Sequence, residues 1–149
     1  MHDVFYSPAT PRVARYVSTR LREADENEMM AYGFWTRDEI FDVVERWAAL
    51  PNSFSGFIDG DPVCLFGIHD SAPWMVGTEA ISDAPLSFHR AAKLIMNCWK
   101  SHHDYLSNYV LAENKSTVKW LRRIGFDVSD EIMYPGVEGR EFLMFEWRA

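Results

Sequence analysis

The chain has 149 residues, the length of one domain, so we predict a single domain over residues 1–149. Hydrophobic residues make up 48% and aromatic residues 15% of the sequence, which excludes a disordered chain because this much apolar surface can form a core. The formal net charge of −7 argues against general binding to nucleic acid or to acidic membranes, since both need clustered positive charge.

The sequence shows no recognisable targeting or membrane-spanning segment. Residues 1–12 lack the basic and apolar regions of a signal peptide. No apolar run reaches the roughly 18 residues that a transmembrane helix needs. Cys64 falls in a predicted buried strand and Cys98 on a predicted buried helix face, which favours reduced core thiols over a disulfide. We therefore expect an intracellular protein with neither a membrane nor a nucleic acid as partner.

The N-terminal part of the chain predicts a strand followed by a helix. Residues 2–6 favour a strand. Thr10 and Pro11 mark a helix start, because a hydroxyl caps the first turn and proline suits the first helical position. Apolar residues at helical spacing continue this helix to about residue 24. A turn or short helix is expected over residues 25–35.

A second helix and a hairpin are predicted next. Thr36 and Glu39 form a capping-box pattern, and the helix that they open ends at a Pro-Asn pair near residue 50. Two apolar strands then follow, over residues 54–58 and 62–68. Asp-Gly-Asp stands between these strands, so a hairpin with a tight turn at Gly60 is expected.

The central part of the chain predicts a strand and the longest helix. Residues 74–80 favour a strand. Ser82 or Asp83 is expected to cap a helix that runs to about residue 103. The predicted buried stripe of this helix consists of Ala91, Leu94, Ile95, Cys98 and Trp99.

Residues 108–126 predict a strand, an asparagine and an amphipathic helix. Asn114 is expected to be the helix N-cap, with its side chain accepting a hydrogen bond from the first turn. Gly125 stands where a left-handed C-cap residue is typical. The apolar stripe of this helix consists of Val118, Leu121 and Ile124.

Two further strands, over residues 126–134 and 140–148, are predicted to follow, joined by a turn with proline and two glycines. The order of elements predicts the α/β (α+β) class. We expect a mixed, mostly antiparallel sheet with helices on both faces.

The strand–Asn–helix unit resembles the end of the GNAT acetyltransferase core, where the strand holds an acceptor amine near the thioester of acetyl-CoA. A wider resemblance covers most of the chain. It is to a phage family of GNAT-like proteins, coded among head and tail genes and related to internal virion protein A of short-tailed phages. The segments that resemble this family are PWMVGTEA at 73–80, FHRAAKLIMNCW at 88–99, LSNYV at 106–110, VKWLRRIGF at 118–126 and PGVEGREFLMFEW at 135–147.

The sequence departs from the GNAT pattern where acetyl-CoA would bind. Active members carry an Arg/Gln-x-x-Gly-x-Gly/Ala phosphate loop before the long helix. The matching segment here has no glycine, places Asp83 near the diphosphate and loses an amide donor at Pro85. The family's general acid is a Tyr seven residues after the Asn, and this chain has Leu121 there. Tyr109 and Tyr134 are the alternative proton donors.

The resemblance also names candidate site residues. Glu79 is the candidate general base, because it lies on the strand that carries a base in the family; the alternative is a polar residue at a strand end. Asn114 is a candidate catalytic or acyl-binding residue, with a helix cap as the alternative. If acetyl-CoA binds, the resemblance implies contacts from Val76, Gly77, Thr78, Ser87, His89, Arg90 and Asn114.

No metal site is predicted. His102 and His103 are adjacent on a helix, so their side chains point about 100° apart and rarely share a metal.

Two functions follow from the resemblance. The first is a virion-associated or assembly protein of a phage or prophage, a pseudoenzyme with a degenerate acetyltransferase-like fold and phage structural proteins or another protein as partners. It would lie in the host cytoplasm during assembly, or in the virion. The second is a working GNAT N-acetyltransferase that uses acetyl-CoA on a protein or a small amine. A host-directed effector is a third, less favoured interpretation.

Overall fold

The computed structural model describes residues 2–33 and 36–149. In this part of the chain, the elements in order are β1 (Val4–Pro8), α1 (Pro11–Ser18), α2 (Glu23–Ala31), α3 (Arg37–Ala48), β2 (Ser53–Ile58), β3 (Asp61–His69), β4 (Ala72–Gly77), the 3-10 helix η1 (Glu79–Asp83), α4 (Pro85–His102), β5 (Tyr105–Leu111), α5 (Lys115–Ile124), β6 (Asp127–Met133) and β7 (Phe142–Arg148). The last two residues of the turn or short helix predicted over 25–35 lie outside the described residues.

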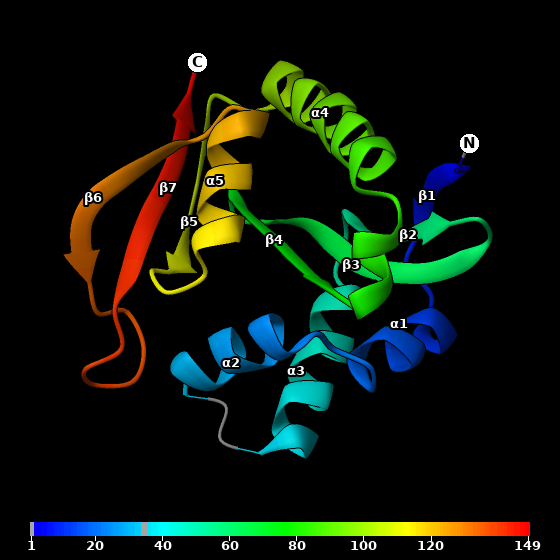
Figure 1. The fold of residues 1–149 in the computed structure, drawn as a ribbon, viewed down its shortest axis with the longest axis horizontal. Coiled ribbons are helices and arrows are strands. Elements are labelled where there is room, and N and C mark those ends of the chain that lie inside the picture. Colours follow the sequence, from blue (N-terminus) through cyan, green and yellow to red (C-terminus); the bar gives the residue numbers. More distant parts are fainter. Residues whose placement is uncertain (1, 34–35) are drawn as a thin grey trace.

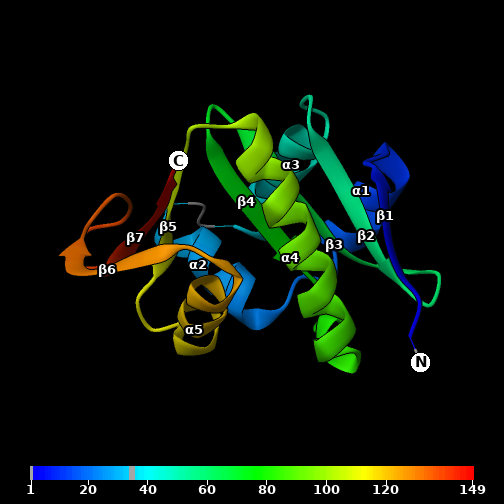
Figure 2. The same cartoon turned by 90° about the horizontal axis from the view of Figure 1, so that it is seen from above.

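The strands form two antiparallel sheets that lie side by side. One has the order β1-β2-β3-β4 and the other the order β5-β7-β6. Helices α1, α2 and α3 lie on one side of the strands, and α4 and α5 lie on the other (Figure 1). The view from above shows α4 crossing over the first sheet (Figure 2). The expected mixed α/β fold, mostly antiparallel with helices on both faces, is therefore confirmed.

Alternation along the strands divides the core into layers. On β3, Leu65 belongs to the apolar cluster formed with α1 and α3. Its neighbour Phe66 belongs to the cluster beneath α4. Successive strand residues point to opposite faces, so a strand covered on both sides is apolar almost throughout. A third cluster joins α5 to the second sheet and includes Phe145.

The β2–β3 hairpin has the predicted turn. Asp59 and Gly60 have φ angles of 50° and 85°. Two left-handed residues in a two-residue loop match the twist of the flanking strands, and Asp-Gly is a favoured pair there.

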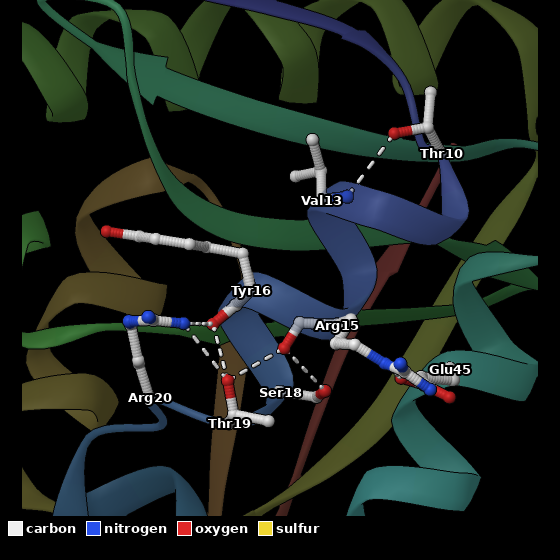
Figure 3. Close-up of polar contacts among 8 residues, drawn as sticks. All are labelled: Thr10, Val13, Arg15, Tyr16, Ser18, Thr19, Arg20 and Glu45. Carbon is white, nitrogen blue, oxygen red and sulfur yellow. Dashed lines mark hydrogen bonds and ion pairs between the residues drawn. The ribbon is translucent and has the colours of Figure 1, made fainter.

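Helix α1 begins as predicted but ends early (Figure 3). The Thr10 hydroxyl accepts a hydrogen bond from Val13 N, which caps the first turn. At the other end, the Thr19 hydroxyl donates to Arg15 O at 2.9 Å. The Arg20 guanidinium donates to Tyr16 O and stacks on the Tyr16 ring. Because these side chains satisfy the last carbonyl groups, the helix ends at Ser18 rather than near residue 24.

Two predictions for α4 are wrong. The helix begins after Ala84 with no side-chain cap, so neither Ser82 nor Asp83 is its N-cap. Leu94 is 71% exposed and Cys98 is exposed as well. Ile95 and Trp99 face the core as predicted, and the inner face of α4 also includes Phe88, Ala92 and Met96. The segment is apolar on two adjacent stripes, and only the packing against the sheet selects between them.

Helix α5 agrees with the prediction except at its cap. Val118, Leu121 and Ile124 are buried against the second sheet. Gly125 is the left-handed C-cap residue, with φ of 119°. Asn114 is the N-cap residue by position, but its side chain makes no capping hydrogen bond. The predicted role of that side chain as a cap is therefore wrong.

Replacing Gly125 tests the C-cap. In Gly125→Ala a methyl group would be forced into a left-handed conformation, and the free energy of unfolding should fall by about 1–2 kcal/mol. Its Cβ would also lie 2.9 Å from Lys100 Nζ, a flexible chain end that can move. Gly125→Asn should lose less, because Asn tolerates this conformation better. Urea denaturation measures both variants, and an alanine variant as stable as the natural protein would contradict the assignment.

Candidate functional site

The site lies where the two sheets separate. Strands β4 and β5 run side by side and are joined at one end, where Ser107 N donates to Ser71 O at 3.0 Å. One step further, Asn108 Nδ2 donates to Pro73 O at 2.9 Å. Beyond this point the strands diverge, as the two arrows in Figure 1 show. We call the open part between β4 and β5 the seam.

A cavity of about 390 Å³ fills the seam and is covered by α2. Its walls combine aromatic rings with a few polar groups. The rings are those of Tyr32, Trp47, Trp74, Tyr109 and Trp120, and the polar residues include Arg22, Asp25, Glu28, Asn108 and Asn114. We call this cavity the seam cleft.

Helix α2 is fixed to the end of β4 through Gly77. The N–H of Arg22 donates to Gly77 O at 2.8 Å, and the N–H of Gly77 donates to Asp25 Oδ2 at 2.8 Å. The Arg22 guanidinium holds Asp25 with two hydrogen bonds of 2.8 and 3.0 Å. Asp25 is buried, and a buried carboxylate is stable only with such partners.

Glu28 and Tyr32 of α2 satisfy the free edge of β5. Leu111 N donates to Glu28 Oε1 at 2.7 Å, and the Tyr32 hydroxyl donates to Tyr109 O at 3.2 Å. The N–H of Tyr109 donates to Asn108 Oδ1 at 2.8 Å. These side chains replace the strand partner that β5 lacks at the seam, since unpaired buried backbone groups are costly.

The surroundings of Glu28 shift its acidity. Burial raises the pKa of Glu28 to about 7, a shift that the hydrogen bond from Leu111 opposes and the charge of Asp25 adds to. Burial also raises the pKa of Tyr32, so its phenol stays protonated. The seam cleft therefore contains a carboxyl group that changes charge near neutral pH, which is a property typical of general bases.

The alternation along β4 also directs the backbone of Met75 at the cleft. Thr78 N pairs with Val63 O on β3, so alternate residues of β4 turn their N–H and C=O groups toward β5. Pro73 O accepts from Asn108 of β5 in this way, and Gly77 N donates to Asp25 of α2. Met75 lies between them, and the same alternation directs its N–H into the seam cleft.

Only some of the site residues predicted from the sequence line the seam cleft. Val76 and Asn114 line the seam cleft. Gly77 is held by Arg22 and Asp25, and the Thr78 hydroxyl caps η1 by accepting from Ala80 N. Neither residue belongs to the lining of the cleft.

The other predicted residues lie outside the cleft. Glu79 was expected on the strand, but β4 ends at Gly77 and Glu79 is exposed in η1. Ser87, His89 and Arg90 lie in the first two turns of α4 and do not line the cleft. Their roles toward acetyl-CoA stay predictions.

Sequence reasoning missed the contribution of α2. Asp25, Glu28 and Tyr32 are spaced three and four apart, which places them on one helix face. This spacing is the signal that could have identified them. Because the segment is polar and has no apolar stripe, its sequence predicts a turn or short helix but no face that contributes to a site.

Within the described residues, no group of three or more His, Cys, Asp or Glu side chains is placed to hold a metal ion. No helix in the same residues has the length and apolar character to cross a bilayer.

Comparison with known proteins identifies the fold. No family model matches the sequence, and no curated protein matches it. Solved structures do match. A GNAT-family acetyltransferase from Bacillus anthracis is 11% identical with a TM-score of 0.65, over 97% of this chain and 94% of that one.

Two enzymes of known acceptor are similar to the same degree. A variant of the spermidine N-acetyltransferase SpeG from Vibrio cholerae is 11% identical with a TM-score of 0.65, over 97% of this chain and 93% of that one. The ribosomal-protein-S18-alanine N-acetyltransferase from Escherichia coli is 12% identical with a TM-score of 0.60, over 99% and 94%. The chain therefore has the fold of the GNAT acetyltransferases.

The acidity of Glu28 predicts a pH-dependent stability. Its folded-state pKa of about 7 lies above the ordinary 4.5, so the folded protein keeps an extra proton between these values and loses stability as the pH rises through them. Glu28→Gln still accepts from Leu111 but cannot ionise. Relative to the natural protein, this variant should gain on the order of 2 kcal/mol between about pH 5 and about pH 8.

Denaturation at several pH values measures this difference. Glu23→Gln on the exposed side of α2 is the matched control and should show no such trend. A constant difference between Glu28→Gln and the natural protein would contradict the raised pKa.

Proposed function

We propose that this protein is a non-catalytic binding protein that uses an acetyltransferase-type fold in the assembly of a phage particle. The main observation against catalysis is the 3-10 helix η1, which directly precedes the long helix α4. In the GNAT pattern a glycine-rich loop before the long helix binds the diphosphate of acetyl-CoA. Here the matching segment, residues 80–87, forms most of the 3-10 helix η1 and the first residues of α4.

The packing of η1 leaves little space for a diphosphate close to its backbone. Ile81 is buried, and its side chain lies directly over Gly77, where an added Cβ would collide with it. Glu79 and Asp83 are exposed at the two ends of η1. An anion at this position would meet two carboxylates, and Pro85 removes one amide at the start of α4.

The proton donor of the family is also replaced. Leu121 stands at its position and is buried in the core. The neighbouring Trp120 stacks on Phe88, with ring centroids 5.9 Å apart. Of the tyrosines in the seam cleft, Tyr32 already donates its hydroxyl proton to Tyr109 O, and its raised pKa makes it a weak acid.

The phage role is supported by the sequence resemblance. The resembling segments extend from residue 73 to residue 147 and include β4, α4, β5, α5 and β7. The proteins of that phage family are coded among head and tail genes. Phage structural proteins are therefore the proposed partners, and the host cytoplasm during assembly, or the virion, is the proposed location.

Acetyl-CoA binding tests the proposal. Calorimetric titration at millimolar acetyl-CoA should give no binding heat, and incubation with polyamines or lysine peptides should give no acetylated product by mass spectrometry. The protein should also be found by mass spectrometry in assembly intermediates or particles purified from phage-producing cells. Micromolar binding with turnover, or absence from every such fraction, would contradict the proposal.

A second candidate, an active N-acetyltransferase, is favoured by Glu28 and by the N–H of Met75, which the alternation of β4 directs at the seam cleft. A carboxyl group with a pKa of about 7 can take a proton from an ammonium, and the Met75 N–H can donate to an acyl carbonyl. If turnover is found, Glu28→Gln should lower kcat on the order of a hundredfold and Glu79→Gln should have little effect. The reverse order would identify Glu79 as the base.

A further inference from the structure

The basic residues of the chain are concentrated on two helices. Helices α4 and α5 together carry seven lysines and arginines and no acidic residue, whereas the rest of the chain has eight basic and 22 acidic residues. Both helices lie on the same side of the strands (Figure 1). The net charge of −7, from which the sequence predicts no nucleic-acid partner, therefore averages over two oppositely charged parts of the molecule.

Most of these cations are available to a ligand. Arg122 Nη2 lies 3.5 Å from Asp130 Oδ1, and Lys100 Nζ lies 5.7 Å from the centre of the Trp147 ring. The other five are exposed and form no ion pair within the described residues; they are Arg90, Lys93, Lys115, Lys119 and Arg123. We call these five residues the basic surface.

The three residues of the basic surface on α5 form a single row. Lys115, Lys119 and Arg123 are four positions apart, and such residues lie above one another on a helix with a rise of roughly 6 Å per step. Leu121 and Ile124 are buried on the other side of the helix. The row therefore points to solvent.

This row meets α4 at His89. Partial burial lowers the pKa of the His89 imidazole, and the positive charges of Arg123 and Lys93 lower it further. Both cations are therefore close enough to one ring for their charges to act on it. The rings of Phe88 and Trp120 stack with centroids 5.9 Å apart and join the two helices at this point. The basic surface is thus continuous from α5 to α4.

The acidic remainder of the molecule does not cancel this surface. The effect of an exposed charge falls off over about 8 Å at physiological ionic strength, so a polyanion responds to the local charge. Helix α3 carries four carboxylates but lies on the other side of the strands (Figure 1). Glu113, just before α5, is paired with Arg140. Clustered positive charge of this kind is what phosphate backbones bind.

The shape of the basic surface favours a strand over a membrane. Lys93 and Arg123 belong to different helices and both approach His89, so they lie in the angle between α4 and α5. A flexible strand can follow this angle, whereas a flat bilayer would touch only the outermost side chains. Leu86 and Leu94 are exposed on α4, but Arg90 stands between them, so they do not form the continuous apolar face of a membrane-bound helix.

From this arrangement, we propose that this protein binds a single strand of nucleic acid through contacts between its phosphates and the basic surface. Lysine and arginine contacts to phosphates position a strand without reading its bases. This inference goes beyond the proposed function and holds whether or not acetyl-CoA binds.

The salt dependence of binding tests the phosphate contacts. Fluorescence anisotropy with a labelled strand of about 20 thymidines should show binding. The logarithm of the binding constant should fall against the logarithm of the salt concentration with a slope of about −3.5, as expected for five contacts to a single strand. The affinity then falls about a hundredfold between 50 and 200 mM salt. No binding at 50 mM salt, or a slope near zero, would overturn the proposal.

Three other anions distinguish the class of ligand. Polyglutamate represents an acidic protein segment, vesicles with about one third phosphatidylserine represent an anionic membrane, and ADP represents a single nucleotide. Each should bind at least about tenfold more weakly than the strand at the same salt concentration, because none offers a row of phosphates along one flexible chain. Binding of any of them as tight as that of the strand would overturn the proposal.

Two charge-reversal variants locate the strand. Lys93→Glu/Arg123→Glu removes two of the five contacts, so the salt slope should change to about −2 and the affinity at about 100 mM salt should fall at least about tenfold. Arg12→Glu/Arg37→Glu makes the same change in net charge at exposed positions of α1 and α3, and its affinity should fall less than about threefold. Equal losses in the two variants would contradict the proposed surface.

A second pair of substitutions serves if the first variant does not fold. Lys115→Glu/Lys119→Glu removes two other exposed contacts of the basic surface, and circular dichroism shows whether it is folded. It should show the same change in slope and affinity. A folded variant that binds the strand like the natural protein would overturn the proposal.

Discussion

The structure depends on two neighbouring strands, β4 and β5, that diverge and belong to separate sheets. Where β4 and β5 diverge, each leaves a row of backbone groups without a strand partner, and buried backbone groups must be satisfied. Helix α2 supplies what is missing: Asp25 binds Gly77 N, Glu28 binds Leu111 N and Tyr32 binds Tyr109 O. This helix is therefore part of the sheet's hydrogen bonding as well as a cover for one face. The position of the seam cleft and the burial of Glu28 beside it both follow from this arrangement.

The same arrangement is the basis of the proposed non-catalytic role. A fold of this kind holds an open seam between two sheets, and the seam can be used for a cofactor or filled by the protein's own side chains. Here η1 closes the end of β4 with Ile81, and Glu28 binds the amide at the end of β5. Fold alone does not decide function, so the proposal is based on these local contacts.

Most of the fold could be predicted from the sequence, because its strongest signals are local. Thr10, the Asp59-Gly60 turn, the stripe of α5 and Gly125 act within a few residues, and the structure confirms each of them. Several of the errors share one cause. The rotation of α4, the exposure of Leu94 and the end of β4 before Glu79 are settled by packing between distant segments. The seam cleft could not be predicted, because Glu28 reaches Leu111 across 83 positions of the chain.

Hydrogen exchange of the backbone amides of Leu111 and Gly77 tests this account most directly. If Glu28 and Asp25 occupy the edges of the seam, both amides exchange slowly in the free protein, and millimolar acetyl-CoA leaves their rates unchanged. Replacing Glu28 with alanine should then accelerate exchange at Leu111 and spare Gly77. Fast exchange in the free protein that becomes slow when acetyl-CoA is added would contradict the account, because the seam would then be an open cofactor site.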